Sequence, residues 1–254
     1  MKTLLIYEDL VSLNRDQHRD FKLSATEAKF AFARETNSVL IAASELPQAA
    51  LDFPCVFIAA DGGHSLAALI GLRDHENLFV QPDGNWAKGS YLPAFFRRYP
   101  FVLAETEGDP TYTVCLDRAY PGLNTEKGEA LFDAEGRETP WLEEIKRFLV
   151  AFRQEMTVSR DFANHLAALE LLEDGVIEFT LNGEKSTLRG VKTVNEGTLR
   201  ALPAETLQDL TQRGWLGLIY AHLLSLNQVQ RLVLRLDERQ AQDRTEADAD
   251  VVKH

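Results

Sequence analysis

The feature that most constrains the fold is a change in residue pattern near Thr139. Before it, short apolar or β-branched runs alternate with turn residues, which predicts strands. After it, apolar residues recur at helical spacing. We therefore expect an α+β protein, with a strand-rich N-terminal lobe of mixed or antiparallel sheet and a mainly helical C-terminal lobe sharing one core. The expected strands are residues 39–42, 55–60, 66–72, 78–80 and 111–116.

Several helices are predicted from their terminal signals. Ser24 and Glu27 have the spacing of a capping box, which predicts a helix through residue 33. Thr139 before Pro140 predicts an N-cap and a first helical position, and an apolar stripe continues from there to residue 156. Further helices are expected at residues 162–172, 203–213 and 215–239, the last as one long helix or a helical hairpin.

A β-hairpin is expected within the helical part. Residues 176–181 and 185–194 flank Asn182-Gly183, the pair preferred in tight hairpin turns. The expected division of the chain is a strand-rich lobe at 1–136, a helical lobe with this hairpin at 137–238, and an acidic, disordered tail at 239–254. Disorder of the tail is predicted because residues 237–250 contain six carboxylates, two arginines and few apolar side chains.

Composition restricts the class of partner. The 254-residue chain has 39 acidic and 27 basic residues, a net charge of -12, which disfavours nucleic acid and anionic membrane surfaces. Cys55 and Cys115 lie in apolar, strand-like contexts that favour buried free thiols, although a single disulfide stays open. The sequence has no apolar run of membrane-spanning length and no signal-peptide pattern, so we expect a soluble, cytoplasmic protein.

The strongest candidate site is the segment 77–101, in which aromatic residues surround two arginines. Arg97 and Arg98 have the chemistry to hold a carboxylate bidentately, and Trp86, Tyr91 and Tyr99 would complete the surface. A peptide C-terminus, an acidic metabolite or a protein partner would suit such a surface. The alternative is that the phenylalanines of this segment are core residues and that the arginines pair with surplus carboxylates.

The histidines offer a different chemistry. His222, with Tyr220 beside it, is either a hydrogen-bonded core residue or a group that orients a ligand at a pocket between helices. His64 and His75, with Asp61 and other nearby acids, are the candidates for a two-histidine, one-carboxylate iron site. Polar surface turns explain the same residues, and we expect no cofactor. Because phosphate-binding loops, nucleophile elbows and zinc-spaced cysteine pairs are all missing, no catalytic residue is assigned.

Four ordered blocks of the chain resemble the SapC family of bacterial proteins. The resemblance implies an interaction protein, since the family name refers to a bacterial surface layer and relatives accompany outer-membrane receptors and halogenase-like proteins. It brings no catalytic residues with it, and the peptide-transporter permease label of some relatives conflicts with a chain that has no membrane span. The blocks are LNRDQH at 13–18, ASELPQAALDFPCVF at 43–57, NLFVQPDGNWAKGSYLPAFFRRYPF at 77–101 and RGWLGLIYAHLLSLNQVQRL at 213–232.

Our main hypothesis is a non-catalytic binding or accessory protein that recognises a peptide, a small acidic ligand or a protein partner. The alternatives are an enzyme acting on a peptide or small molecule, metal-dependent in one version, and a structural protein of a surface layer. Oligomeric state stays open. The binding residues expected under the main hypothesis are Trp86, Tyr91, Arg97, Arg98, Tyr99, Tyr220 and His222.

Overall fold

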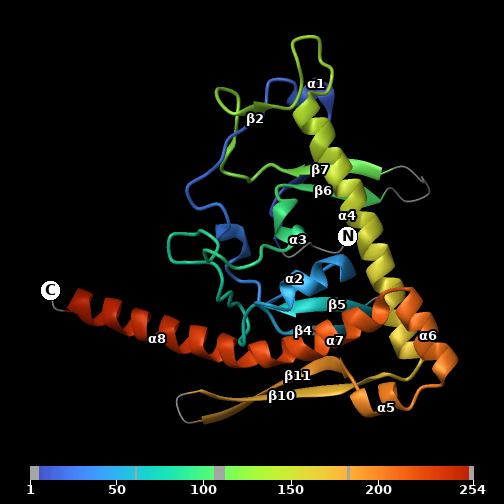
Figure 1. The fold of residues 1–254 in the computed structure, drawn as a ribbon. Helices are drawn as coiled ribbons and strands as arrows, with labels where there is room; N and C mark the ends of the chain where they lie inside the picture. Colours follow the sequence, from blue (N-terminus) through green and yellow to red (C-terminus); the bar gives the residue numbers. More distant parts are fainter. Residues whose placement is uncertain (1–5, 61, 106–111, 182–183, 252–254) are drawn as a thin grey trace. The chain divides into compact units, whose positions relative to one another are not determined.

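The computed structural model describes residues 6–60, 62–105, 112–181 and 184–251 (Figure 1). The chain divides into two compact units. Unit 1 consists of segments 1–34, 80–87 and 94–155, and unit 2 of segments 35–79, 88–93 and 156–254. Each unit therefore takes segments from both sides of residue 137. Antiparallel sheets and a helical C-terminal part confirm the α+β class.

Unit 1 contains two small antiparallel sheets. One has the strand order β1-β7-β6 and the other the order β8-β2-β9. One hydrophobic core cluster of this unit contains Leu23, Phe101, Leu116, Leu131, Phe132, Leu142 and Leu149. The elements are β1 (Leu10–Ser12), α1 (Arg15–His18), β2 (Lys22–Leu23), η1 (Ala31–Ala33), α3 (Ala94–Arg97), β6 (Phe101–Glu105), β7 (Tyr112–Asp117), β8 (Leu123–Asn124) and β9 (Glu129–Ala130).

The long helix α4 (Pro140–Ala168) stands where two helices were expected. Its start agrees with the prediction, because the Thr139 hydroxyl oxygen accepts the Leu142 N–H at 3.3 Å. The expectation of a second helix was wrong, since no Gly or Pro interrupts the 29-residue segment. Residues up to Glu155 belong to unit 1 and those from Met156 onward to unit 2.

Unit 2 is built on one five-stranded antiparallel sheet with the order β10-β11-β4-β5-β3. The predicted hairpin is confirmed by β10 and β11, although its turn, Asn182-Gly183, lies outside the described residues. The strands of this sheet are β3 (Ser38–Leu40), β4 (Cys55–Ala60), β5 (Gly63–Leu69), β10 (Leu172–Leu181) and β11 (Glu184–Val194).

Helices of unit 2 contact this sheet: α7 contacts β4 and β11, and α8 contacts β10. Between α6 and α7 the backbone turns at Gly214, whose φ of 73° favours glycine. The helical elements of unit 2 other than α4 are η2 (Ala43–Glu45), α2 (Leu46–Ala49), α5 (Glu196–Arg200), α6 (Ala204–Gln212), α7 (Trp215–Ser225), η3 (Leu226–Gln228) and α8 (Val229–Val251).

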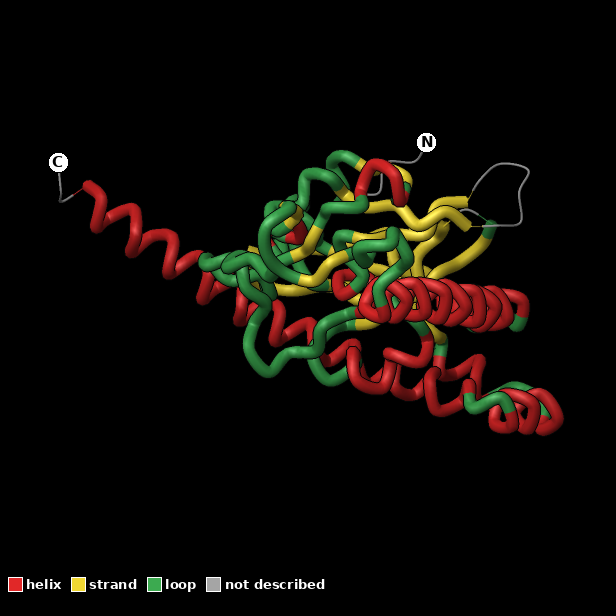
Figure 2. Tube along the Cα trace, turned by 90° about the horizontal axis from the view of Figure 1, so that it is seen from above, coloured by secondary structure: helices red, strands yellow, loops and turns green. Residues whose placement is uncertain are grey.

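The end of the chain differs from expectation, because α8 continues as a helix to Val251 whereas an irregular tail was expected from residue 239. No Gly or Pro follows Gly217, and Ala, Gln, Glu and Arg are common in this segment, so helix propensity is high throughout. Figures 1 and 2 both show the C-terminal part of α8 extending beyond the strands of its unit.

Two further local predictions were wrong. The expected helix at 24–33 is reduced to η1, because backbone groups of this segment bond to distant partners: Ser24 N–H donates to the Gly122 carbonyl at 3.0 Å and Phe30 N–H to Gly84 at 2.8 Å. The expected strand at 78–80 is reduced to a single bridge between Val80 and Trp86.

Candidate functional site

The predicted aromatic segment forms a connected group of rings in unit 1. Trp86 lies 5.5 Å from Phe96 and 6.0 Å from Phe30, measured between ring centroids. Tyr99 stacks on Phe32 with centroids 3.8 Å apart and an interplanar angle of 21°. Such aromatic pairs contribute about 0.5–1.5 kcal/mol each beyond the area they bury. The rings therefore hold α3, which ends at Arg97, in a fixed place within this unit.

Arg98 lies among three aromatic rings just after α3. Its guanidinium carbon is 4.1 Å from the ring centroid of Phe95, 5.2 Å from that of Phe152 and 5.8 Å from that of Tyr7. Its Nε is buried and has no hydrogen-bond partner among the described residues. Burial lowers the pKa of Arg98, and the neighbouring Tyr7 hydroxyl opposes this effect. A buried guanidinium N–H without an acceptor is an incomplete interaction, because buried donors normally have a partner.

Arg97, the last residue of α3, lies over the same face of α4 that Arg98 contacts. Its guanidinium carbon is 5.6 Å from the ring centroid of Phe148. Phe148 and Phe152 are one helical turn apart and stack at 6.4 Å, with an interplanar angle of 27°. The two guanidinium groups therefore lie over neighbouring rings. We refer to Arg97, Arg98, Tyr7, Phe95, Phe148 and Phe152 as the arginine–aromatic cluster.

The polar groups beside the cluster are engaged within unit 1. The Tyr7 hydroxyl donates to the Phe101 carbonyl at 2.8 Å, and burial raises the pKa of Tyr7 to about 12. Asp117, which is fully buried, accepts the N–H groups of Glu8 at 3.0 Å, Asp9 at 2.9 Å and Ala119 at 3.1 Å. This carboxylate is thus satisfied by backbone amides rather than by an arginine ion pair among the described contacts.

The structure divides the predicted site residues between the two units. Trp86, Arg97, Arg98 and Tyr99 lie in unit 1, where Phe95 and Phe96 connect Trp86 to Arg98 through ring contacts. The others, Tyr91, Tyr220, His222, His64 and His75, lie in unit 2.

Tyr91 takes part in the internal packing of unit 2. Its hydroxyl donates to Glu45 Oε1 at 2.9 Å, and its N–H donates to Asp52 Oδ2 at 2.8 Å. Glu45 is buried and also accepts the Ala42 N–H at 2.8 Å. The Tyr91 hydroxyl therefore satisfies a buried carboxylate of its own unit.

His222 is completely buried, with both ring nitrogens bonded to backbone. Nδ1 lies 2.7 Å from the Cys55 carbonyl, and Nε2 accepts the Val194 N–H at 3.1 Å. A carbonyl only accepts and an amide only donates, so the ring is neutral with its proton on Nδ1. Burial lowers the pKa of His222 to about 4. Tyr220, two residues earlier in α7, has 41% of its surface exposed and is accessible to a partner.

The two candidate metal ligands lie on different elements of unit 2. His64 is in β5, and its N–H donates to Asn164 Oδ1 at 2.8 Å. The exposed His75 has its Nδ1 3.6 Å from the carboxylate of Glu35. Asp61 lies outside the described residues. Within the described part of the chain, no three His, Cys, Asp or Glu side chains are grouped as a metal ion requires.

Four members of the cluster were not identified from the sequence. Phe148 and Phe152 belong to the apolar stripe predicted up to residue 156, Phe95 was considered only as a core residue of segment 77–101, and Tyr7 was given no role. A sequence signal did exist for the phenylalanines, because residues four apart lie on one helix face. For Tyr7 there was none, since its contact with Arg98 joins distant parts of the chain.

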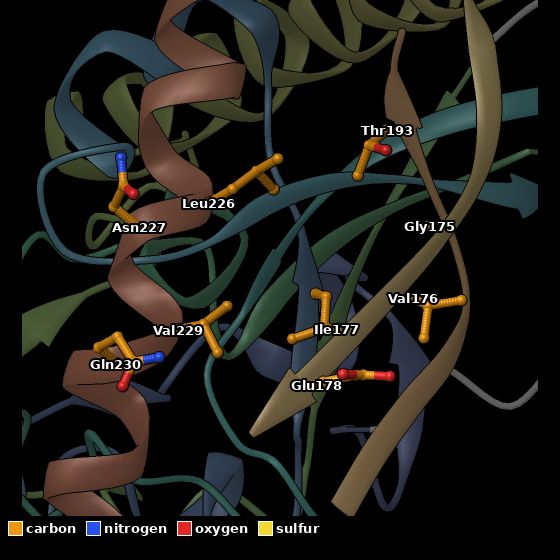
Figure 3. Close-up of a pocket in the computed structure, with 9 residues that line it drawn as sticks. All are labelled: Gly175, Val176, Ile177, Glu178, Thr193, Leu226, Asn227, Val229 and Gln230. Atoms are coloured by element: carbon orange, nitrogen blue, oxygen red, sulfur yellow. The ribbon is translucent and has the colours of Figure 1, made fainter. Parts of the chain in front are cut away.

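A separate hollow lies in unit 2 beside β10 (Figure 3). Its volume is about 320 Å³, and it lies between residues of β10 and the start of α8. Gly175, Val176, Ile177, Glu178, Thr193, Leu226, Asn227, Val229 and Gln230 line it.

The fold and the cluster together describe an α+β protein with an arginine–aromatic cluster in unit 1. The model of the SapC family matches residues 13–232, and the chain belongs to the SapC family. No curated protein and no solved structure matches the chain. Among the described helices, none combines the length and the apolar character needed to cross a bilayer.

Proposed function

We propose that this SapC-family chain is a non-catalytic binding or accessory protein that recognises a carboxylate through the arginine–aromatic cluster. The observation that carries the proposal is the buried Nε of Arg98, which has no hydrogen-bond partner among the described residues. The ligand would be a peptide, a small acid or the acidic segment of a protein partner.

Charge balance supports this role for Arg98. The chain has 39 acidic residues, so arginine has no shortage of potential ion-pair partners in sequence. Arg98 nevertheless lies against Phe95, Phe152 and Tyr7. Aromatic faces stabilise a guanidinium while leaving its in-plane N–H groups available, and a carboxylate matches that planar fork. Arg97, over the neighbouring ring of Phe148, supplies a second cation.

The engagement of two reactive groups supports a non-catalytic role. Both ring nitrogens of His222 are bonded to backbone, so this imidazole has no free nitrogen for proton transfer. Burial raises the pKa of the Cys55 thiol to about 12, which keeps the thiol protonated and unreactive as a nucleophile. Both cysteines are free and buried, which suits the reducing cytoplasm, the location that we propose.

The test begins with native mass spectrometry of protein purified gently from its own host. We expect the wild-type protein to show the added mass of a bound ligand, and the double variant Arg97→Ala/Arg98→Ala to lack it. The control variant Arg147→Ala, which removes an exposed arginine of α4, should keep the added mass. A second measurement compares a synthetic hexapeptide ending in glutamate with its uncharged C-terminal amide, in which that glutamate is replaced by glutamine. Equal binding of the two peptides would contradict carboxylate recognition.

A further inference from the structure

The strand β10 forms one edge of the sheet in unit 2 (Figure 1). It is ten residues long, with the sequence LEDGVIEFTL, and pairs with β11 on one side. Alternate residues of an edge strand direct N–H and C=O groups away from the sheet, where another chain can pair with them. Proteins often block such edges with Pro or Lys, and β10 contains neither.

The pairing of β10 with β11 is interrupted beside the hollow of Figure 3. Gly175 pairs with Val191 and Ile177 pairs with Leu188, so the single residue Val176 lies opposite two residues of β11. These two residues are Arg189 and Gly190, one more than on β10, and the φ of 83° at Gly190 permits the irregularity. Val176 has 51% of its surface exposed, in keeping with the alternation of buried and exposed residues along β10. The irregularity thus lies on the β11 side of β10, while the other side of the strand, beside the hollow, is the edge of the sheet.

The lining of the hollow combines an apolar floor with an acidic group. Ile177 on the strand and Leu226 and Val229 on the helical side supply the apolar surface (Figure 3). Glu178 supplies a carboxylate, and no Lys or Arg lines this hollow. A volume of about 320 Å³ accommodates one or two side chains rather than a large ligand.

We propose that β10 binds an extended, basic segment of a partner polypeptide, which adds a strand to the sheet. Only a polypeptide backbone matches donors and acceptors at strand spacing, and side chains on one face of the added strand would enter the hollow. Glu173, Asp174 and Glu178 make this edge acidic, and Lys192 pairs with only one of them, Asp174, at 2.8 Å. The partner strand would therefore carry Lys or Arg.

Charge also distinguishes this partner from a second copy of the chain. A second β10 would place the same carboxylates across the new pair, and like charges on neighbouring strands are destabilising. The inference concerns unit 2 and is independent of the arginine–aromatic cluster in unit 1.

The test uses the full-length protein and a fluorescein-labelled peptide of four Lys-Val repeats. Its control is the same peptide N-methylated at its four central residues, which keeps the charge but removes donors from both peptide edges. We expect binding of the first peptide and at least about tenfold weaker binding of the second. The variant Glu178→Lys should weaken binding of the first peptide by at least about tenfold. The variant Asp161→Lys makes the same charge change at an exposed position of α4 and should have little effect on this binding.

Three outcomes would overturn the inference. Equal binding of the methylated peptide would mean charge attraction without strand pairing. Equal weakening by Asp161→Lys and Glu178→Lys would mean that the effect is not local to β10. If neither of the two peptides binds, the edge does not accept a strand. Amide hydrogen exchange gives a direct readout, because protection should increase in β10 and stay unchanged in β3 at the opposite edge.

Discussion

His222 donates from Nδ1 to the carbonyl of Cys55 over 2.7 Å and so joins α7 to β4. Its other nitrogen accepts from Val194 in β11 at 3.1 Å. Lys192 pairs with Phe57 across these two strands, so Val194 and Cys55 would face each other two residues further along. The imidazole thus bridges two backbone groups that would otherwise bond directly. On the same strand, the Cys55 N–H donates to Ser225 Oγ of α7 at 2.9 Å. His222 therefore contributes to the stability of unit 2.

The first prediction concerns the stability of the His222→Ala variant. The substitution removes a buried ring and leaves the Val194 N–H without its acceptor, so we expect a loss of about 2–4 kcal/mol in the free energy of unfolding. Urea denaturation measures this loss. Tyr220→Ala, at an exposed position of the same helix, should cost less than about 1 kcal/mol. Equal stability of the wild type and His222→Ala would contradict the structural role of the imidazole.

The second prediction concerns pH. The pKa of His222 is lowered to about 4 in the folded protein, against an ordinary value of 6.5. Between these two pH values, residue 222 therefore binds more protons in the unfolded chain than in the folded protein. The contribution of His222 to the free energy of unfolding is present above pH 6.5 and is lost as pH falls towards 4. The full loss would be on the order of 3 kcal/mol. Because other groups titrate in the same range, the measurement is the difference in unfolding free energy between the wild type and His222→Gln across pH. A constant difference between pH 7 and pH 4 would show that His222 does not titrate as expected.

The third prediction separates binding from stability at Arg98. Methionine keeps the apolar volume among Phe95, Phe152 and Tyr7 and removes the buried, unpartnered Nε. We therefore expect Arg98→Met to change the melting temperature little or to raise it, because replacing an unsatisfied buried charge with an apolar group is often neutral or favourable. Carboxylate binding should be lost at the same time. A large fall in melting temperature would instead assign Arg98 a structural role.

Local signals in the sequence predicted the elements whose backbone bonds are also local. The hairpin β10–β11, the strand β4, the helix α6 and the Thr139 cap all follow from alternation, spacing or capping residues. The expected helix at 24–33 failed where its capping residue, Ser24, has distant partners: its hydroxyl oxygen accepts from Asn124 Nδ2 at 3.3 Å, and its hydroxyl donates to the Gly122 carbonyl. A local pattern does not show that a distant side-chain donor takes the place of the backbone N–H that a capping oxygen would accept.

The division into units could not be predicted from one sequence. Unit 2 joins segment 35–79 to segment 156–254, for example through the Ser159 Oγ that accepts the Ala43 N–H at 2.6 Å. Such contacts leave no periodic signal in the chain. For the candidate site, the composition of segment 77–101 indicated Arg97 and Arg98, but the rings around Arg98 come partly from Tyr7 and Phe152, which lie far from it in sequence.

The two side chains of α7 that reach Cys55 also limit how the length of this helix can vary. His222 and Ser225 are three residues apart, so both lie on the helix face that meets β4. Inserting one residue between them would rotate one relative to the other by about 100° and separate them from their shared strand. Natural or engineered insertions should consequently be excluded from this turn of α7 and tolerated in the part of α8 that extends beyond the sheet.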